Sequence, residues 1–545
     1  MLGKPRPAPA VAVASGAATT LTVNTVKSDS GATHSYSEEE KAAFSEHINR
    51  VLAGDARLAD RLPLDPASDA LFRAVGDGIL LCKLMNKAEP DTVDERALNL
   101  GGKLNVYQVN ENQNIAVNAA KAIGCKVVNV HNEDLIEGRE HIVLGVVWQI
   151  VRIQLLRQIN LKSHPELVRL LEEGEELSDL LKLPPDQILL RWLNFHLKAA
   201  GDARRARNFG DDLKDSHVYT VVLNQIAPKD CDKAALAEPD PLKRAALVIA
   251  NSQKIGVESF IKPENIADGN AKLNLAFCAQ IFNTNPGLVV SEEEVRDMAG
   301  LLDDDVGDSR EERAFRVWMN SLGVEDLYIN NLYEDVRDGV ALLQVMDRVE
   351  PGVVSWRNVN RPPKNKFKRV ENCNYVVVLG KSNAFKFSLV GIGGVDVVDG
   401  SKKPVLSVSW QLMRHHALKL LASLTADGSI VTDRDVLDWA NARVARTGKE
   451  LRMASFRDPS LRDSLFLLAL CGALAPGIIN SEYVTPGVTD EDRVNNAKYI
   501  VSVARKMGVT VFLTFEDLVE VKPKMVLLFT AALMSWDKSA PGNAL

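Results

Sequence analysis

Side chains able to carry out catalysis or bind a metal ion are scattered through this chain and form no recognised catalytic pattern. The nine histidines do not pair at ligand spacing apart from the adjacent His415 and His416, and the six cysteines stand singly without a CxxC pair. The nucleophile-elbow, zinc-protease and Walker phosphate-loop patterns do not occur, and the glycines around Gly391 do not complete GxGxxG. The sequence therefore predicts a protein that is not an enzyme, with no cofactor or metal and with reduced, mostly buried thiols.

The densest acidic segment resembles a calcium loop in composition but not in spacing. Between Ser291 and Glu312 there are ten acidic and two basic residues, a charge of −8, whereas the whole chain carries −7. The acidity thus belongs to one linker-like segment, and the remaining chain is close to neutral. An EF-hand loop that began at Asp303 would place Asp308 where glycine is needed and Ala314 where the bidentate glutamate is needed. We therefore expect no intrinsic calcium control.

The densest basic segment, RNVNRPPKNKFKR, has six bases and no acid within thirteen residues. A basic run with one aromatic residue can contact an acidic protein surface, a nucleic acid or an acidic lipid, and it can equally be an ordinary solvated loop. The six bases are Arg357, Arg361, Lys364, Lys366, Lys368 and Arg369.

The elements that carry these residues follow from an internal repeat. LFRAVGDGILLCKLMNKAEP, which starts at Leu71, matches LYEDVRDGVALLQVMDRVEP, which starts at Leu332, at an offset of 261. Further along, Trp148 matches Trp410, so the register drifts by only one residue. Chance similarity does not hold register in this way, and the chain is therefore predicted to contain a duplication.

A second pair of segments interleaves with the first. KDSHVYTVVLNQIAP matches RDSLFLLALCGALAP, so the repeats follow the order A, B, A′, B′. Each unit opens on a helical run, and one position of this run is occupied by His47, Trp192, Trp318 or Trp439. Successive members of this set lie 121 to 145 residues apart. Apolar residues recur mainly at spacings of three and four, which is typical of amphipathic helices. The predicted fold class is all-α, with four helical domains in two tandem pairs.

The last helix of the first unit is unusual because IVLGVVWQIVRIQLL is apolar almost all round. A helix of this kind belongs in the middle of a bundle. We expect the tryptophans of the opening and final helices to be core residues; they are Trp148, Trp192, Trp318, Trp410 and Trp439.

These repeats resemble a known domain. The pattern of the first unit is similar to that of the calponin-homology domain. It consists of DGILLCKLMN followed by Glu-Pro, then Glu-Asn at the start of a helix, then a tryptophan in a long final helix. The linker from His164 to Leu197 resembles the join between the first two such units of the fimbrin (plastin) family. The resemblance covers about residues 36 to 538, and the order of four units matches that family rather than spectrin or α-actinin relatives. Animal plastins carry EF-hands before the first unit, whereas this sequence has about 35 residues there.

The resemblance implies where actin would be contacted. In the family, the final helix of one unit and the opening helix of the next supply much of the contact, and they correspond here to Ile142 to Arg157 with Asp186 to Leu197, and to Val405 to Leu420 with Asp433 to Val444. The polar candidates on these helices are Gln149, Arg152, Arg157, Arg191, Gln411, Arg414 and Lys419. The basic run from Arg357 to Arg369 joins them as a candidate because actin's surface is acidic.

The predicted boundaries divide nearly the whole chain among the four units. They are a flexible tail at 1–35, units at 36–158, 183–287, 308–421 and 429–538, linkers at 159–182 and 288–307, and a C-terminal tail at 539–545. No window approaches the roughly 18 to 20 apolar residues of a membrane span. The tail has only a weak, punctuated apolar run, which leaves a cleaved signal open but does not favour it. We expect a cytoplasmic protein of the actin cytoskeleton.

The functional expectation follows from the duplication. One monomer with two filament-binding modules would hold two actin filaments together without forming a dimer. We expect F-actin as the partner, and neither nucleic acid nor membrane. The alternative is a cytoskeletal signalling or microtubule-associated adaptor, in which only one module binds filaments and the other binds another partner.

Overall fold

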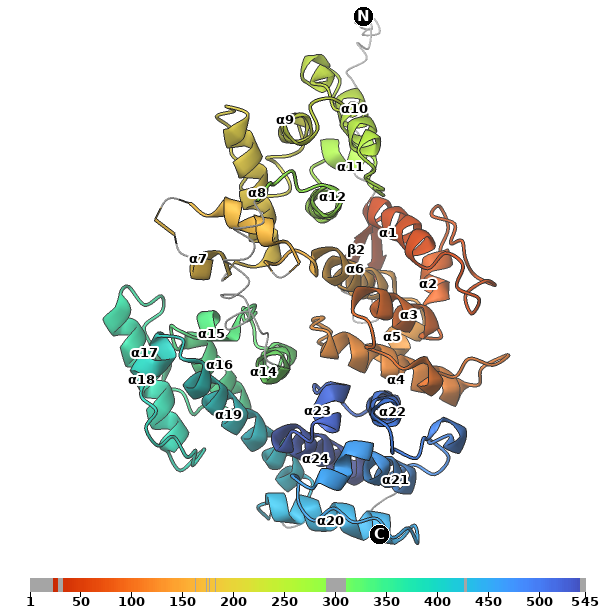
Figure 1. Ribbon diagram of the computed structural model, residues 1–545, viewed down its shortest axis with the longest axis vertical. Coiled ribbons are helices and arrows are strands. Elements are labelled where there is room, and N and C mark those ends of the chain that lie inside the picture. The colour runs from red at the N-terminus through yellow and green to blue at the C-terminus, as the bar shows by residue number, and fades with distance from the viewer. Residues whose placement is uncertain are drawn as a thin grey trace, which may run out of the picture.

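The structure is a computed structural model that describes residues 23–27, 33–161, 163–172, 174–175, 177–181, 183–290, 310–425 and 429–539. These residues form four helical units, called units 1 to 4 in chain order, and the all-α prediction is confirmed (Figure 1). Units 1 and 2 make up the first module, and units 3 and 4 make up the second. An antiparallel hairpin of β1 (Val23–Lys27) and β2 (Thr33–Ser37) lies within the segment predicted as a tail. The other residues of that segment lie outside the described ranges.

The units share one order of elements, namely an opening helix, a middle pair of helices, a short helix and a long final helix. Unit 1 contains α1 (Glu38–Val51), α2 (Ala70–Ala74), α3 (Ile79–Ala88), η1 (Glu95–Ala97), α4 (Val106–Ala122), α5 (Asn132–Ile136) and α6 (Glu140–Leu156). The link to unit 2 contains η2 (Pro165–Leu170) and α7 (Leu177–Leu181). Unit 2 contains α8 (Pro185–Ala199), α9 (His217–Ile226), η3 (Ala234–Ala237), α10 (Pro241–Lys254), α11 (Pro263–Ala267) and α12 (Ala271–Thr284).

The second module repeats this order. Unit 3 contains α14 (Arg310–Ser321), α15 (Leu332–Asp335), α16 (Val340–Val349), η4 (Trp356–Asn358), α17 (Lys366–Lys381), α18 (Gly394–Val398) and α19 (Lys402–Ser423). Unit 4 contains α20 (Asp433–Ala445), η5 (Pro459–Asp463), α21 (Leu465–Leu474), η6 (Ser481–Tyr483), α22 (Asp490–Lys506), α23 (Phe515–Val519) and α24 (Pro523–Ser539).

A left-handed residue after an aspartate starts the same helix in every unit. In units 1 and 3 this residue is Gly78 or Gly339, with φ of 77° and 76°. In units 2 and 4 it is Ser216 or Ser464, with φ of 63° and 59°. The preceding aspartate accepts a hydrogen bond from the first N–H of the helix, which satisfies one of the free donors at a helix start. The Asp-Gly and Asp-Ser repeats of the sequence are therefore one structural device.

A buried asparagine fixes the neighbouring loop in units 1 and 3. The Asn112 side chain accepts from the Asn99 N–H at 2.9 Å and donates to the Asn99 carbonyl at 3.1 Å. In unit 3, Asn372 makes the same pair of bonds with Asn360, at 2.9 and 3.1 Å. Because the side-chain amide replaces a missing backbone partner, the loop can run close to the helix without losing hydrogen bonds.

The predicted central helix is confirmed as a core element. Helix α6 packs against α1, α3 and α5 of its own unit and against α12 of unit 2. Of the tryptophans expected in the core, Trp192 and Trp318 are buried, whereas the other three are half-buried against it; these are Trp148, Trp410 and Trp439. All six cysteines are buried and unpaired, as predicted, and burial raises the pKa of thiols such as Cys125.

The two modules are joined by a contact between their first and last units, in addition to the chain connection. Helices α4 and α22 lie side by side in Figure 1. The Thr510 hydroxyl donates to the Asn118 side chain at 2.7 Å, and the Asp94 N–H donates to the Ser502 hydroxyl at 2.8 Å. No pattern in the sequence predicts this contact, because its partners lie about 400 residues apart in the chain and belong to different repeats.

Arg505 is the most enclosed charge of this contact. It is 4% exposed and donates to the Thr92 carbonyl of unit 1, yet no carboxylate pairs with it among the described residues. Burial, together with the nearby charge of Arg313, lowers its pKa to about 10. Arg505 nevertheless remains charged at neutral pH, and it lines a hollow between the modules together with Arg310 and Arg313.

Replacing Gly78 by alanine should destabilise unit 1 by about 2 to 5 kcal/mol. The left-handed conformation accounts for about 1 to 2 kcal/mol and the steric clash for about 1 to 3 kcal/mol, because the new Cβ would lie 2.9 Å from the Asn112 carbonyl. Gly54→Ala is the matched control, since Gly54 has the same φ of 77° but no neighbouring atom within 4 Å. Thermal melting should show the larger loss for Gly78→Ala. Equal losses would contradict the packing argument.

Candidate functional site

The glutamines predicted as contact residues hold loops of their own units. The Gln149 side chain, on α6, accepts from the Lys126 N–H and donates to the Lys126 carbonyl at 3.2 Å. In unit 3 the Gln411 side chain does the same with Ser388, at 2.7 and 2.9 Å. The two glutamines occupy equivalent places in the repeat, and each fastens the loop before the short helix to the final helix.

Two predicted arginines lie at the junction of the units within each module. Arg152 on α6 lies 3.6 Å from the Asp186 carboxylate at the start of α8. In the second module Arg414 on α19 pairs with Asp433 at the start of α20, at 2.6 Å. The aspartates also complement the positive ends of the helices that they begin. Each ion pair therefore bridges the two helices that the resemblance assigns to filament contact.

The other basic candidates on these helices are paired within the protein as well. Arg157 pairs with Glu89 at 3.0 Å, and Lys419 pairs with the equivalent Glu350 at 2.7 Å. Arg191 makes a two-pronged pair with Glu175 in the linker, at 2.6 and 2.7 Å. All three pairs are partly exposed, so each contributes little to stability but orients its side chain.

The basic run lies on the outside of unit 3, from η4 into the first turn of α17. The Asn365 side chain caps this helix by accepting from the Lys368 N–H at 3.1 Å. Lys366 pairs with Asp399 at 2.9 Å and Lys368 with Glu371 at 2.7 Å, and both pairs are largely exposed. Lys364 is also exposed. The run therefore lies at the surface, although Lys366 and Lys368 are paired within the protein as the candidates on the final helices are.

The remaining arginines of the run differ in their surroundings. The Arg361 guanidinium lies over the Trp356 ring, 3.6 Å from the ring centroid, in a cation–π contact. Arg357 and Arg369 are exposed, and Arg369 borders a small acidic hollow with Glu334 and Asp338. The structure thus places all six bases at the surface of unit 3 but does not bring them next to Arg414 or Lys419 in any described contact.

An exposed aromatic residue, missed by the sequence analysis, lies within the run. Phe367 is 80% exposed on the first turn of α17. Tyr107 is 81% exposed at the same place in unit 1, two residues after the capping Asn105. Single exposed apolar side chains are common on protein surfaces, but here an aromatic one stands at the same place in two units. The signal was available, because the repeat register places Tyr107 opposite Phe367.

The structure provides no evidence for catalytic or metal chemistry in the part of the chain that it describes. Within the described ranges, no three side chains of histidine, cysteine, aspartate or glutamate lie close enough together to hold a metal ion. His415 pairs with Glu350 at 2.8 Å, whereas His416 accepts from the Trp318 indole. The acidic segment tested as a calcium loop, and the predicted linker 288–307, fall mainly outside the described residues. No described helix is long and apolar enough to cross a lipid bilayer.

A buried histidine lies where unit 1 meets unit 2. The His47 ring is hydrogen-bonded to Gln154 of α6 at 2.9 Å and packs edge-on against Phe260 of unit 2, with ring centroids 4.9 Å apart. Burial, together with the charge of Arg50, lowers the pKa of His47 to about 4, although the bond to Gln154 opposes the shift. In the second module Trp318 and His416 occupy the equivalent positions, and burial lowers the pKa of His416.

Comparison with known proteins agrees with this architecture. The calponin homology (CH) domain model matches residues 38–155, 183–287, 309–418 and 430–539. Fimbrin of Dictyostelium discoideum is 46% identical over 95% of this chain and 84% of its own, and plastin-3 of Rattus norvegicus is 46% identical over 93% and 81%. The crystal structure of the actin-crosslinking core of Schizosaccharomyces pombe fimbrin matches with a TM-score of 0.79 and 40% identity, covering 92% of this chain and 100% of that one.

Acidification from pH 7 to pH 5 should destabilise the first module by about 2 kcal/mol through His47. An unfolded histidine takes up its proton near pH 6.5, whereas folded His47 does so only near pH 4. The part of the unfolding free energy that depends on neutral His47 is therefore fully present above pH 6.5 and is lost as the pH falls toward 4. The melting temperature of His47→Gln should therefore fall less between pH 7 and pH 5 than that of the wild type. His131→Gln, at an exposed position, is the control and should behave as the wild type. The same loss in His47→Gln and wild type would contradict the assignment.

Proposed function

The chain belongs to the fimbrin/plastin family, and on that premise we propose that it cross-links two actin filaments as a monomer, with one tandem pair of calponin-homology units on each filament. It is an actin-filament bundling protein that acts through its tandem calponin-homology domains. We infer that it works in the actin cytoskeleton as a structural protein, and we assign it no catalytic activity.

One observation carries the two-site proposal: the junction of each module is built in the same way. The ion pair of Arg152 with Asp186 has its counterpart in that of Arg414 with Asp433. The hydrogen bonds by which Gln149 and Gln411 hold the loops at Lys126 and Ser388 match in the same way. Two modules with the same internal construction are suited to bind the same kind of partner, and one chain then carries two filament sites.

The contact between units 1 and 4 supports bundling at a defined spacing. Its hydrogen bonds join the modules directly, so their separation need not depend on the linker alone. Two sites on a rigid body fix the distance and angle between bound filaments, whereas two sites on a loose tether would not.

For the filament surface itself, we propose the basic run and Phe367 in the second module. The six bases are concentrated within thirteen residues around the exposed Phe367, whereas the basic candidates on α6, α8 and α19 are spread over three helices. Lys366 and Lys368 are paired, as those candidates are, but their pairs lie at the surface. Exposed bases steer an acidic partner, and a central aromatic residue supplies apolar contact area. In the first module, Tyr107 is the equivalent aromatic residue, with fewer bases near it in the sequence: Arg96 and Lys103 match Arg357 and Lys364.

Each module alone should bind filaments, but neither should bundle them. We expect residues 36–287 and residues 308–545 to pellet with actin filaments at high centrifugal speed. Only the whole chain should pellet them at low speed, because a single site cannot bridge two filaments. Circular dichroism melting would control for folding, since separation exposes Arg505 and its neighbours. Bundling by a monomeric half would refute the two-site mechanism, and failure of one folded half to bind would favour the adaptor alternative.

Reversing the charges of Lys364, Lys366 and Lys368 to glutamate in the whole chain should abolish bundling but leave binding through the first module. The effect should be largest at low salt, because exposed charges act over about 8 to 10 Å at physiological ionic strength. Replacing the same lysines by arginine keeps the charge and is the matched control. Both variants should melt as the wild type does. If the reversed variant still bundles at low salt, the run is a solvated surface and the contact lies elsewhere.

A further inference from the structure

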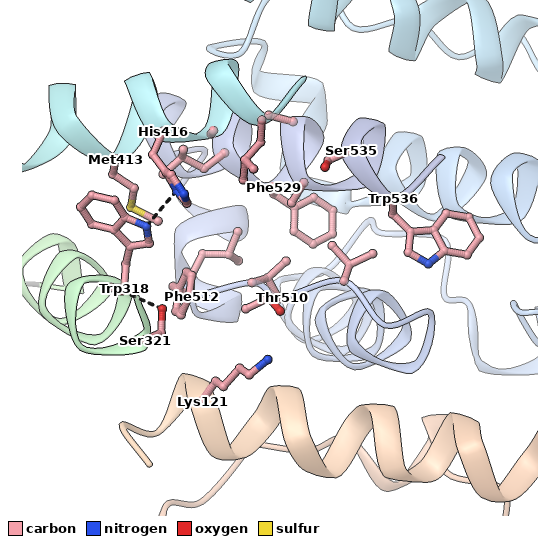
Figure 2. A pocket seen from close by; sticks show the side chains of 18 of the residues that line it. Lys121, Trp318, Ser321, Met413, His416, Thr510, Phe512, Phe529, Ser535 and Trp536 are labelled. Carbon is pink, nitrogen blue, oxygen red and sulfur yellow. Dashed lines mark hydrogen bonds between the residues drawn. The ribbon is translucent and has the colours of Figure 1, made fainter. Parts of the chain in front are cut away.

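A pocket of about 510 Å³ opens where units 1, 3 and 4 meet (Figure 2). Its walls are mainly apolar: Trp318 comes from α14, Met413 from α19, Phe512 from the loop before α23, and Phe529 and Trp536 from α24. The volume is within the range of about 300 to 1,000 Å³ that is typical of small-molecule sites. Neither the bundling mechanism nor the filament-contact residues make use of this pocket.

Among the described residues, Lys121, on the last turn of α4, is the one charged residue that lines the pocket, and none of the lining residues is acidic. Figure 2 shows the lysine extending from α4 toward Thr510. Within the described residues its side chain has no hydrogen bond or ion pair, and burial lowers its pKa. A half-buried ammonium group beside an apolar hollow lacks the counter-charge that such a group normally has.

Three other polar side chains around the pocket already have partners, whereas the Ser535 hydroxyl and the Trp536 indole have none among the described residues. His416 accepts from the Trp318 indole at 3.4 Å, and the Ser321 hydroxyl donates to the Trp318 carbonyl at 2.7 Å. The Thr510 hydroxyl donates to the Asn118 side chain. Since burial lowers the pKa of His416 from its ordinary value of 6.5, this ring is neutral at pH 7. Among the described residues of the lining, Lys121 is therefore the group that attracts a negatively charged head group.

We propose that this pocket binds a small anionic amphiphile of the fatty-acid class. The aliphatic chain would lie among Trp318, Met413 and Phe529, and the carboxylate would pair with Lys121. A single lysine without an arginine fork fits one negative charge better than the two charges of a phosphate. Because its walls belong to units 1, 3 and 4, an occupant would contact both modules.

The test is a titration of the full-length protein with decanoate and with decanol, its uncharged analogue. Isothermal titration calorimetry should show one saturable decanoate site, and the fluorescence of Trp318 and Trp536 should change on binding. Lys121→Met should weaken decanoate binding about tenfold, the equivalent of one charge-assisted hydrogen bond, and leave decanol binding unchanged. Lys381→Met is the matched control, because Lys381 is the repeat equivalent of Lys121 on α17 and is exposed away from the pocket.

The position of the site is tested separately. Ala532→Trp should fill the pocket and remove the binding of both ligands. Thermal melting is the control that shows whether this variant is folded. The proposal is overturned if decanoate shows no saturable binding, if Lys121→Met binds it as tightly as Lys381→Met, or if binding survives in a folded Ala532→Trp variant.

Discussion

The fold depends on one close approach, in which a left-handed turn lies against the helix that carries a buried asparagine. In unit 3 the Asn372 side chain donates to the carbonyl of Asp338, immediately before Gly339. In unit 4 the Asn496 side chain donates in the same way to the carbonyl of Asp463, before Ser464. In units 1 and 3 the close approach leaves no space for a side chain at Gly78 or Gly339, and it sets how the two helices cross. The final helices, and with them the junctions between units, are placed relative to that crossing.

Much of the fold was predictable because local sequence patterns determine its helices, and these patterns recur in each unit. The Asp-Gly and Asp-Ser pairs identify helix starts, and three- and four-residue apolar spacing identifies the helices between them. The buried role of Asn112 was less visible, since an asparagine in a polar helix sequence has no pattern of its own. The contact between units 1 and 4 could not be predicted, because residues such as Thr510 and Asn118 have ordinary types and meet only in the folded chain.

The candidate site was predicted in part. The sequence correctly indicates which helices lie at the junctions, but it cannot show that Arg152 and Arg414 have aspartate partners there. Charge type alone does not separate an arginine that orients a helix from one that is available to a partner. We prefer the surface around Phe367 because six bases gather there beside an exposed aromatic residue, whereas the bases of α6 and α19 are spread along their helices.

The contact between the first and last units also affects how the protein is made. Domains emerge from the ribosome in order, at roughly 5 to 20 residues per second, and usually fold as they appear. Thr510 follows its partner Asn118 by 392 residues, so unit 1 would wait roughly 20 to 80 seconds for unit 4. During that interval the face of α4 that will receive α22 is open to other nascent chains, including those of the same polysome. The polar character of this contact, made by hydroxyls and amides rather than a continuous apolar face, limits the risk that neighbouring copies pair prematurely.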